Sequence, residues 1–329
     1  MRHMLRVPWP SLLPAHAKPD DAILPLEGWR FVTVWEFEWF PALMLLLVAG
    51  LYAFGVYRLH RRGDRWPVHR TALFMAGVLI LAVGMFSSVG AYDTVLFWFH
   101  MIQHMLFNMI APPFLVGGAP VTLALRALPH RQRQWLLTVL HSRVAKIILF
   151  PPLTTVLMVG TPFALYFTGW YELTLRSDFH HDFLHFWLIT IGCLFFFPLL
   201  GVDPVPIKMP YPIRILLFMV TMPFHAFLGV IIMGSKHLIA EDWYLSFGRT
   251  WGPTPLEDQN WAGALLWATG DLTMLFAMIL IFVQWVRESN REARRIDRAL
   301  DREEAERAKQ AEARYHGQGQ DPEEGTRDE

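Results

Sequence analysis

Histidines recur at helical spacing inside stretches that are apolar enough to lie within a membrane. The first stretch holds His100 and His104, the second holds His181 and His185, and a third holds His225. Residues four apart lie on one face of an α-helix, so each pair presents two imidazoles together. An ionisable ring in hydrocarbon costs free energy unless it has a partner or a function. The pattern therefore indicates a buried metal or cofactor site.

Carboxylate, amide and thioether groups occur near these imidazoles. Asp93 and Asn108 fall on the same helical face as the first histidine pair, and Met101 and Met105 lie beside that face. Asp271 stands in a further apolar stretch. Imidazole binds copper, zinc, iron and nickel, while thioether sulfur favours Cu(I). A buried carboxylate next to a histidine either binds the ion or orients the ring.

A depth estimate narrows the set of ligands. A helix rises about 1.5 Å per residue, which converts sequence position into depth below the outer membrane surface. Two tiers are expected, His100 with His185 and His104 with His225 and Asp271, and the inner halves of these helices carry no comparable ionisable group. The site is therefore predicted to open to the extracytoplasmic face. The predicted metal ligands are His100, His104, His181, His185, His225 and Asp271.

Composition places the chain in the membrane class. It is 53% hydrophobic over 329 residues, with a mean hydropathy of +0.29. The formal net charge of +0 gives no support to nucleic-acid binding. The single cysteine excludes a disulfide framework within the chain and any CxxC site. The first residues lack the continuous apolar core of a removable signal peptide.

Seven stretches reach the roughly 20 apolar residues that a helix needs to cross the hydrocarbon core. Pro112-Pro113 in the third and Pro151-Pro152 in the fourth predict kinks or helix ends. The predicted fold is all-α, a polytopic bundle of seven transmembrane helices in contact with the lipid bilayer. The stretches cover residues 39–58, 71–89, 93–116, 145–168, 180–200, 213–234 and 261–286.

The basic residues are unevenly distributed over the predicted loops. Twelve Lys and Arg lie in the loops after the first, third and fifth spans, and three lie in the other loops. Because cytoplasmic loops carry the excess, the N-terminus is predicted outside and the C-terminus in the cytoplasm. We divide the chain into an extracytoplasmic segment (1–36), a transmembrane domain (37–286) and a charged cytoplasmic tail (287–329). The tail is predicted to be helical over 291–313 and then disordered.

Four segments carry motifs at the third, fifth, sixth and seventh spans. They read HMIQHMLFNMIAPPFLVGGAP at 100–120, HHDFLHFWLITIGCLFFFPLLGVDPVP at 180–206, PFHAFLGVIIMGS at 223–235 and PLEDQNWAGALLWATGD at 255–271. Together they resemble the CtaG family of multi-spanning cytochrome c oxidase assembly factors, over roughly residues 35–286. Asn260 and Trp261 depart slightly from the commoner Gln-Leu of this family, and neither is a candidate ligand.

The resemblance implies help in building a haem–copper oxidase, at the step that places copper in its catalytic subunit. It implies a copper ion as the bound metal, with the oxidase catalytic subunit and an extracytoplasmic copper donor as partners. It further implies a multi-pass protein of the bacterial plasma membrane and no enzymatic activity. A single-span copper chaperone of the same name binds copper through cysteines, and that mechanism does not carry over to a chain with one cysteine.

Three other hypotheses stay open at this stage. Paired histidines on facing helices also suit a b-type haem in a membrane electron carrier. Ionisable residues in spans also mark ion paths, as in a copper transporter. Histidines between packed helices also serve as structural hydrogen-bonding residues in an inert scaffold. The scarcity of polar groups in the inner halves of the helices argues against a complete ion path and against a two-haem wire.

Overall fold

The computed structural model describes residues 24–26 and 28–318, with side chains placed as far as residue 310. Every named element among these residues is a helix, which confirms the predicted all-α fold. Within the described part of the chain, six helices are long and apolar enough to cross a membrane, and there are up to seven spans if the bent pair α10–α11 counts as one. A helix satisfies its own backbone groups in lipid, so apolar stretches of this length fold in this way.

Long helices follow the predicted stretches in order. The first two are α2 (Trp39–Arg61) and α3 (Val68–Phe86). The third span is built from α5 (Phe97–Met105), η1 (Leu106–Ile110), α6 (Ala111–Gly117) and α7 (Pro120–Ala127). The others are α10 (Pro151–Phe167), α12 (Asp178–Leu200), α13 (Tyr211–Gly234) and α15 (Pro255–Gln318). Short helices fill the connections: α1 (Arg30–Thr33), α4 (Ser88–Ala91), α8 (His130–Leu140), α9 (Arg143–Ile148), α11 (Trp170–Arg176) and α14 (Glu241–Ser246).

A proline sets where the fourth span begins. The predicted stretch starts at residue 145, but α10 starts at Pro151 and the residues before it form the separate helix α9. Proline is favoured at the first position of a helix, because the N–H it lacks would have no acceptor there. At its other end α10 stops, and α11 follows after a bend of 72°. The fourth span is therefore shorter than the sequence predicted.

The third span contains one turn of π-helix, η1, which the sequence did not predict. The N–H of Ala111 donates to the carbonyl of Leu106, five residues back. Pro112 and Pro113 follow and have no N–H to donate, so carbonyls in this turn lose their usual α-helical donors. Such turns are rare and occur frequently at functional sites. Asn108 lies within this one.

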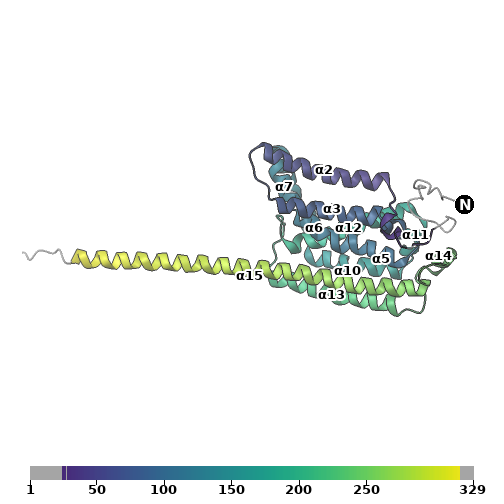
Figure 1. Cartoon of the computed structure of the whole chain (residues 1–329). Helices are drawn as coiled ribbons and strands as arrows, with labels where there is room; N and C mark the ends of the chain where they lie inside the picture. Colours follow the sequence, from purple (N-terminus) through teal and green to yellow (C-terminus); the bar gives the residue numbers. More distant parts are fainter. Residues whose placement is uncertain (1–23, 27, 319–329) are drawn as a thin grey trace, which may run out of the picture. The chain divides into compact units, whose positions relative to one another are not determined.

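The third and fifth spans occupy the interior of the bundle. In the most apolar stretch of each span, the buried share is 56% for the third span and 61% for α12, but only 17% for α2. Helix α6 packs against both α3 and α12, and Figure 1 shows these helices side by side. A Cβ at Gly192 would overlap the carbonyl oxygen of Asn108 and lie 2.5 Å from Pro112 Cγ. Glycine therefore lets α12 approach the π turn closely, which buries the histidines of both spans between them.

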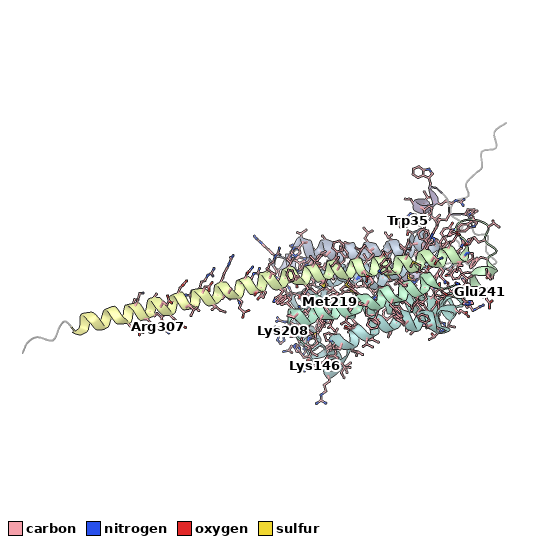
Figure 2. All side chains as sticks on the ribbon, turned by 90° about the horizontal axis from the view of Figure 1, so that it is seen from below. Trp35, Lys146, Lys208, Met219, Glu241 and Arg307 are labelled. Atoms are coloured by element: carbon pink, nitrogen blue, oxygen red, sulfur yellow. The ribbon has the colours of Figure 1, made fainter. Side chains whose placement is uncertain are left out.

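The two ends of the bundle carry different groups. Lys146 and Lys208 lie at one end, here called the basic end, while Glu241 and Trp35 lie at the other (Figure 2). Helices α5, α12 and α15 begin at this second end, so it holds the histidine-rich starts of α5 and α12, and we call it the histidine end. The predicted orientation places the histidine end outside the cell, and this orientation stays a prediction.

The chain divides into two compact units, Met1–Met278 and Ile279–Glu329. The division falls within α15, a single helix that runs from Pro255 to Gln318. The seventh span and the predicted charged helix (291–313) are therefore continuous. Of the predicted N-terminal segment (1–36), residues 1–23 and 27 lie outside the described residues, as do residues 319–329 of the predicted disordered end.

Candidate metal centre

Four of the six predicted ligands meet at the histidine end. His100 and His104 come from α5, and His181 and His185 come from α12. Ring centroids lie 3.9 Å apart for His100 and His104, 4.5 Å for His181 and His185, and 5.9 Å across the two helices for His100 and His181. None of the four side chains is more than 7% exposed. We call these four residues the histidine cluster.

Asp93 adds a carboxylate to the histidine cluster. It lies in the turn between α4 and α5, is 1% exposed, and places Oδ2 3.0 Å from His181 Nε2. One ligand atom each from Asp93, His181 and His185 lies within 4.8 Å of the others. Ligands bound to one ion at about 2.0–2.2 Å stand roughly 3 Å apart, so small movements suffice to close these three atoms around an ion. The sequence placed Asp93 on the histidine face, but it was not among the predicted ligands.

Two imidazoles and one carboxylate form a donor set that suits copper, zinc or iron. Three protein donors also leave part of a four-coordinate shell open, as in exchangeable and catalytic metal sites. The carboxylate supplies one negative charge, which lowers the cost of holding a cation in a low-dielectric interior. The residues present therefore fit a transition-metal ion.

Gln103 orients one of these rings. His185 Nε2 lies 2.8 Å from Gln103 Oε1, and Gln103 Nε2 donates to the carbonyl of Gly84 at 3.1 Å. Because the amide nitrogen is used by that carbonyl, its oxygen accepts from His185, and the proton of His185 is assigned to Nε2. Metal-binding histidines usually donate their other ring N–H in this way. A glutamine between two histidines gives no spacing signal, so the sequence did not reveal it.

The other two predicted ligands, His225 and Asp271, belong to α13 and α15. His225 on α13 packs beside Gly270 of α15, and its Nδ1 lies 3.3 Å from the carbonyl of Thr221. Asp271 follows Gly270 in α15. Among the described residues, neither His225 nor Asp271 has a hydrogen bond or a ring contact with the histidine cluster. A depth estimate from the sequence does not fix the direction in which a side chain points. Metal binding by these two residues stays a prediction.

The Asp-Gln motif before the seventh span holds the start of α5. Asp258 accepts the backbone N–H groups of Phe97 and Trp98 at 3.1 and 2.9 Å, and Arg249 donates to the same carboxylate at 3.4 Å. A carboxylate at a helix N-terminus satisfies unpaired donors and complements the helix dipole. Gln259 accepts the N–H of Ile239 at 2.7 Å. The aspartate of the motif thus stabilises the start of α5, the helix that carries His100 and His104.

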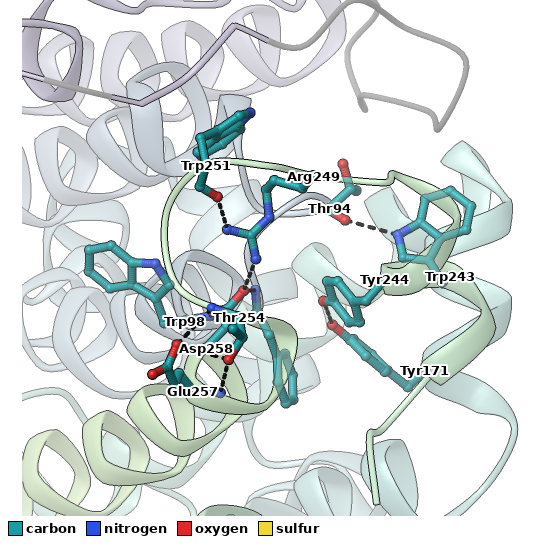
Figure 3. A network of polar contacts seen from close by, with 11 residues as sticks. Thr94, Trp98, Tyr171, Trp243, Tyr244, Arg249, Trp251, Thr254, Glu257 and Asp258 are labelled. Carbon is teal, nitrogen blue, oxygen red and sulfur yellow. Dashed lines mark hydrogen bonds and ion pairs between the residues drawn. The ribbon is translucent and has the colours of Figure 1, made fainter.

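A network of polar contacts fixes the turn that carries Asp93 (Figure 3). Trp243 Nε1 of α14 donates to the carbonyl of Thr94, the residue after Asp93, at 2.9 Å. Beside it, the hydroxyls of Tyr171 and Tyr244 share a short hydrogen bond between α11 and α14. Helix α14 therefore holds the Asp93 turn and is itself tied to α11, so the position of this carboxylate depends on tertiary contacts from distant parts of the chain.

Glu36 places a second carboxyl group near Asp93. Its backbone N–H donates to the carbonyl of Phe86 at 2.8 Å, which holds the segment before α2 against the end of α3. Its Oε1 atom is buried, with no hydrogen-bond partner among the described residues. Burial, together with the negative charge of Asp93, raises the pKa of Glu36 to about 8. Glu36 is therefore mostly protonated at neutral pH.

The fold and the cluster together define a class, that of multi-pass helical membrane proteins with an imidazole–carboxylate site buried between spans. Within this class the chain belongs to the family of cytochrome c oxidase caa3 assembly factors (Caa3_CtaG), whose model matches residues 50–288. The match confirms the family that the four sequence motifs indicated.

Curated relatives come from mycobacteria. The chain is 36% identical over 284 residues to "Uncharacterized protein Mb0105" of Mycobacterium bovis, which covers 84% of this chain and 43% of the relative. It is 34% identical over 279 residues to "Uncharacterized protein ML1998" of Mycobacterium leprae, which covers 83% of this chain and 42% of the relative. The chain thus spans less than half the length of these relatives. No solved structure matches it. The relatives and the apolar helices identify a multi-pass bacterial membrane protein.

Proposed function

We propose that this chain binds copper within the membrane and assists its insertion into the catalytic subunit of a caa3-type haem–copper oxidase, acting as an assembly factor and not as an enzyme. The observation that carries the proposal is the convergence of Asp93, His181 and His185, whose ligand atoms lie within 4.8 Å of one another. Family membership supplies the oxidase as the object of assembly. Copper is chosen among the metals that this donor set suits because the oxidase contains it.

The donor set sets the conditions for binding and release. Neutral imidazoles and an ionised carboxylate bind the ion, so binding displaces protons and low pH releases the metal. His181 Nε2 and Asp93 Oδ2, now 3.0 Å apart in a hydrogen bond, would exchange their shared proton for the ion. Because the predicted orientation puts the histidine end outside, copper would arrive from an extracytoplasmic donor and leave to the catalytic subunit by lateral contact in the membrane.

Metal analysis of the detergent-purified full chain tests the proposal. The protein is exposed to Cu(II), freed of unbound metal and measured by mass spectrometry. Wild type is expected to retain copper, and the Asp93→Asn/His181→Ala/His185→Ala variant is expected to lose it. His180→Ala is the matched control, because His180 lies on the same helix but hydrogen-bonds Ser177 instead of the cluster. Equal copper in wild type and in the triple variant contradicts the proposal.

The absorption spectrum of the same samples separates the alternatives. A copper site predicts no Soret band in protein purified from haem-replete cells, whereas a Soret band that disappears with His181→Ala supports the haem-binding electron carrier. Copper uptake into vesicles that depends on the histidine cluster supports the transporter. In cells, the triple variant is expected to lower caa3 oxidase activity while the chain remains in the membrane at its normal level.

A further inference from the structure

A small pocket borders His104, and Asp93 does not line it. Its volume is about 10 Å³, roughly the room that one water molecule or ion needs. His104, Asn108, Met101 and Met105 of the third span line it together with Tyr166 of α10. The rest of the lining is apolar, and it contains no carboxylate. The pocket therefore has a different chemistry from the site that holds Asp93.

Two polar atoms at the pocket have no protein partner. His104 Nε2 and Asn108 Oδ1 are buried and make no hydrogen bond among the described residues. The two side chains are only 3% and 1% exposed. Buried polar atoms nearly always have a partner, because leaving one unsatisfied in a low-dielectric interior costs free energy. The unpartnered atoms indicate that something occupies the pocket.

The contacts of Tyr166 indicate which tautomer of His104 is present. The Tyr166 hydroxyl lies 3.0 Å from His104 Nδ1 and also donates to Met101 Sδ at 3.7 Å. A hydroxyl has a single proton, so both contacts are satisfied only when Nδ1 donates to the phenol oxygen and the hydroxyl donates to sulfur. In that tautomer the lone pair of His104 is on Nε2, the unpartnered atom.

We propose that this pocket is a second metal position, selective for cuprous copper, in which His104 Nε2 and Met105 Sδ bind the ion and Tyr166 positions His104 and Met101 beside it. The proposal rests on copper being the metal of the proposed function. Soft thioether sulfur and imidazole select Cu(I). Without a carboxylate in the lining, a monovalent ion costs less to bury here than a divalent one.

X-ray absorption at the copper edge tests the proposal, because sulfur and nitrogen neighbours scatter differently. The full chain in detergent is loaded anaerobically with Cu(I), supplied with a competing chelator that reports affinity. Sulfur scattering is expected in wild type and is expected to disappear in Met101→Leu/Met105→Leu. The affinity for Cu(I) should fall by at least the roughly 10- to 100-fold that losing even a supporting group costs a metal site. Leucine keeps the volume of the pocket close to its original value.

Two further variants serve as controls for this measurement. Met158→Leu is the matched control, since Met158 is a fully buried methionine of α10 that does not line the pocket, and it should keep the wild-type spectrum. Asp93→Asn/His181→Ala removes the other site and should keep the sulfur signal. Wild-type copper with nitrogen and oxygen neighbours only, or an unchanged sulfur signal in the double leucine variant, overturns the second position and leaves a bound water in the pocket.

The outcomes also separate this proposal from the proposed function. Copper held by nitrogen and oxygen alone supports the proposed function and rejects the cuprous position. A sulfur signal that persists after the Asp93 site is removed supports the cuprous position whatever the Asp93 site binds. Absence of any bound copper in wild type, under air and under anaerobic Cu(I), rejects both.

Discussion

The two halves of α12 serve different purposes. Its first two turns bring His181 and His185 to the histidine cluster, whereas further along Phe195 and Phe196 pack against Phe218 of α13. Those three aromatic rings are fully buried, with centroids 5.1 to 5.9 Å apart. One helix therefore supplies two imidazoles of the proposed metal site at the histidine end and apolar packing toward the basic end. The depth of a residue in the bundle, more than the helix it belongs to, separates the site from its scaffold.

Three buried aspartates also differ in the groups that donate hydrogen bonds to them. Asp258 caps the start of α5 and Asp203 accepts the backbone N–H groups of Val121 and Thr122 near the start of α7, so both are held by the main chain. Asp93 instead forms a hydrogen bond with the imidazole of His181. All three side chains are at most 4% exposed. Burial alone does not identify a candidate ligand, but the type of hydrogen-bond donor distinguishes the two structural carboxylates from the carboxylate of the proposed metal site.

The largest effect is expected at a structural carboxylate. Asp258→Ala removes two capping bonds from α5 and leaves the Arg249 guanidinium buried without its carboxylate. Breaking a buried ion pair costs about 3–5 kcal/mol, so a large fall in thermal stability in detergent is expected. Asp258→Asn, which keeps one acceptor oxygen, should lose less. Equal stability of wild type and Asp258→Ala would show that the cap does not hold α5.

The phenylalanine packing should affect stability without affecting metal binding. Phe218→Ala leaves a cavity against Phe195 and Phe196. In water-soluble cores Phe→Ala costs roughly 3–5 kcal/mol, and the lower end is expected here because lipid removes most of the transfer contribution. Unfolding measurements should register this loss, while the copper content of the folded fraction stays at the wild-type value. Copper loss in the folded fraction would break the distinction between the two halves.

Disturbing the close approach of α12 to the π turn is expected to have an intermediate effect on stability. Gly192→Ala places a methyl group on the carbonyl of Asn108 and should destabilise by about 1–3 kcal/mol. Gly160→Ala is the matched control, because nothing lies within 4 Å of a Cβ there and alanine favours a helix. Thermal unfolding in detergent is expected to lower the midpoint for the first variant and to leave it equal or higher for the second.

A further effect is a pH dependence at the histidine end. The pKa of Glu36 rises from 4.5 to about 8 on folding, so the stability that the protonated carboxyl contributes is full below pH 4.5 and is lost as pH rises through about 8. Glu36→Gln removes this loss, and its midpoint should exceed that of wild type increasingly between pH 5 and 9. The exposed Glu241→Gln, at the same end of the bundle, is the control. Parallel pH profiles for wild type and Glu36→Gln would contradict the assigned burial.

Apolar length and helical spacing predicted much of this protein. They predicted the all-α fold, the order of the spans and the two pairs His100/His104 and His181/His185, because these features depend on local sequence. The roles of Asp93 and Gln103 and the contacts of Tyr166 depend on how distant helices pack, and no spacing rule reports that. Whether His225 and Asp271 face the same site depends on the rotation of α13 and α15 about their axes, which a depth estimate does not determine.

The three-donor geometry around Asp93, His181 and His185 has a kinetic consequence. An ion held there would have a vacant coordination position, so an incoming imidazole from an acceptor could attach before the original donors detach. Exchange by this associative route never passes through an ion without ligands. Such an ion would be very high in free energy inside a membrane, where no water replaces the lost ligands. The rate of metal transfer would then increase with acceptor concentration, while spontaneous dissociation of the metal would remain slow.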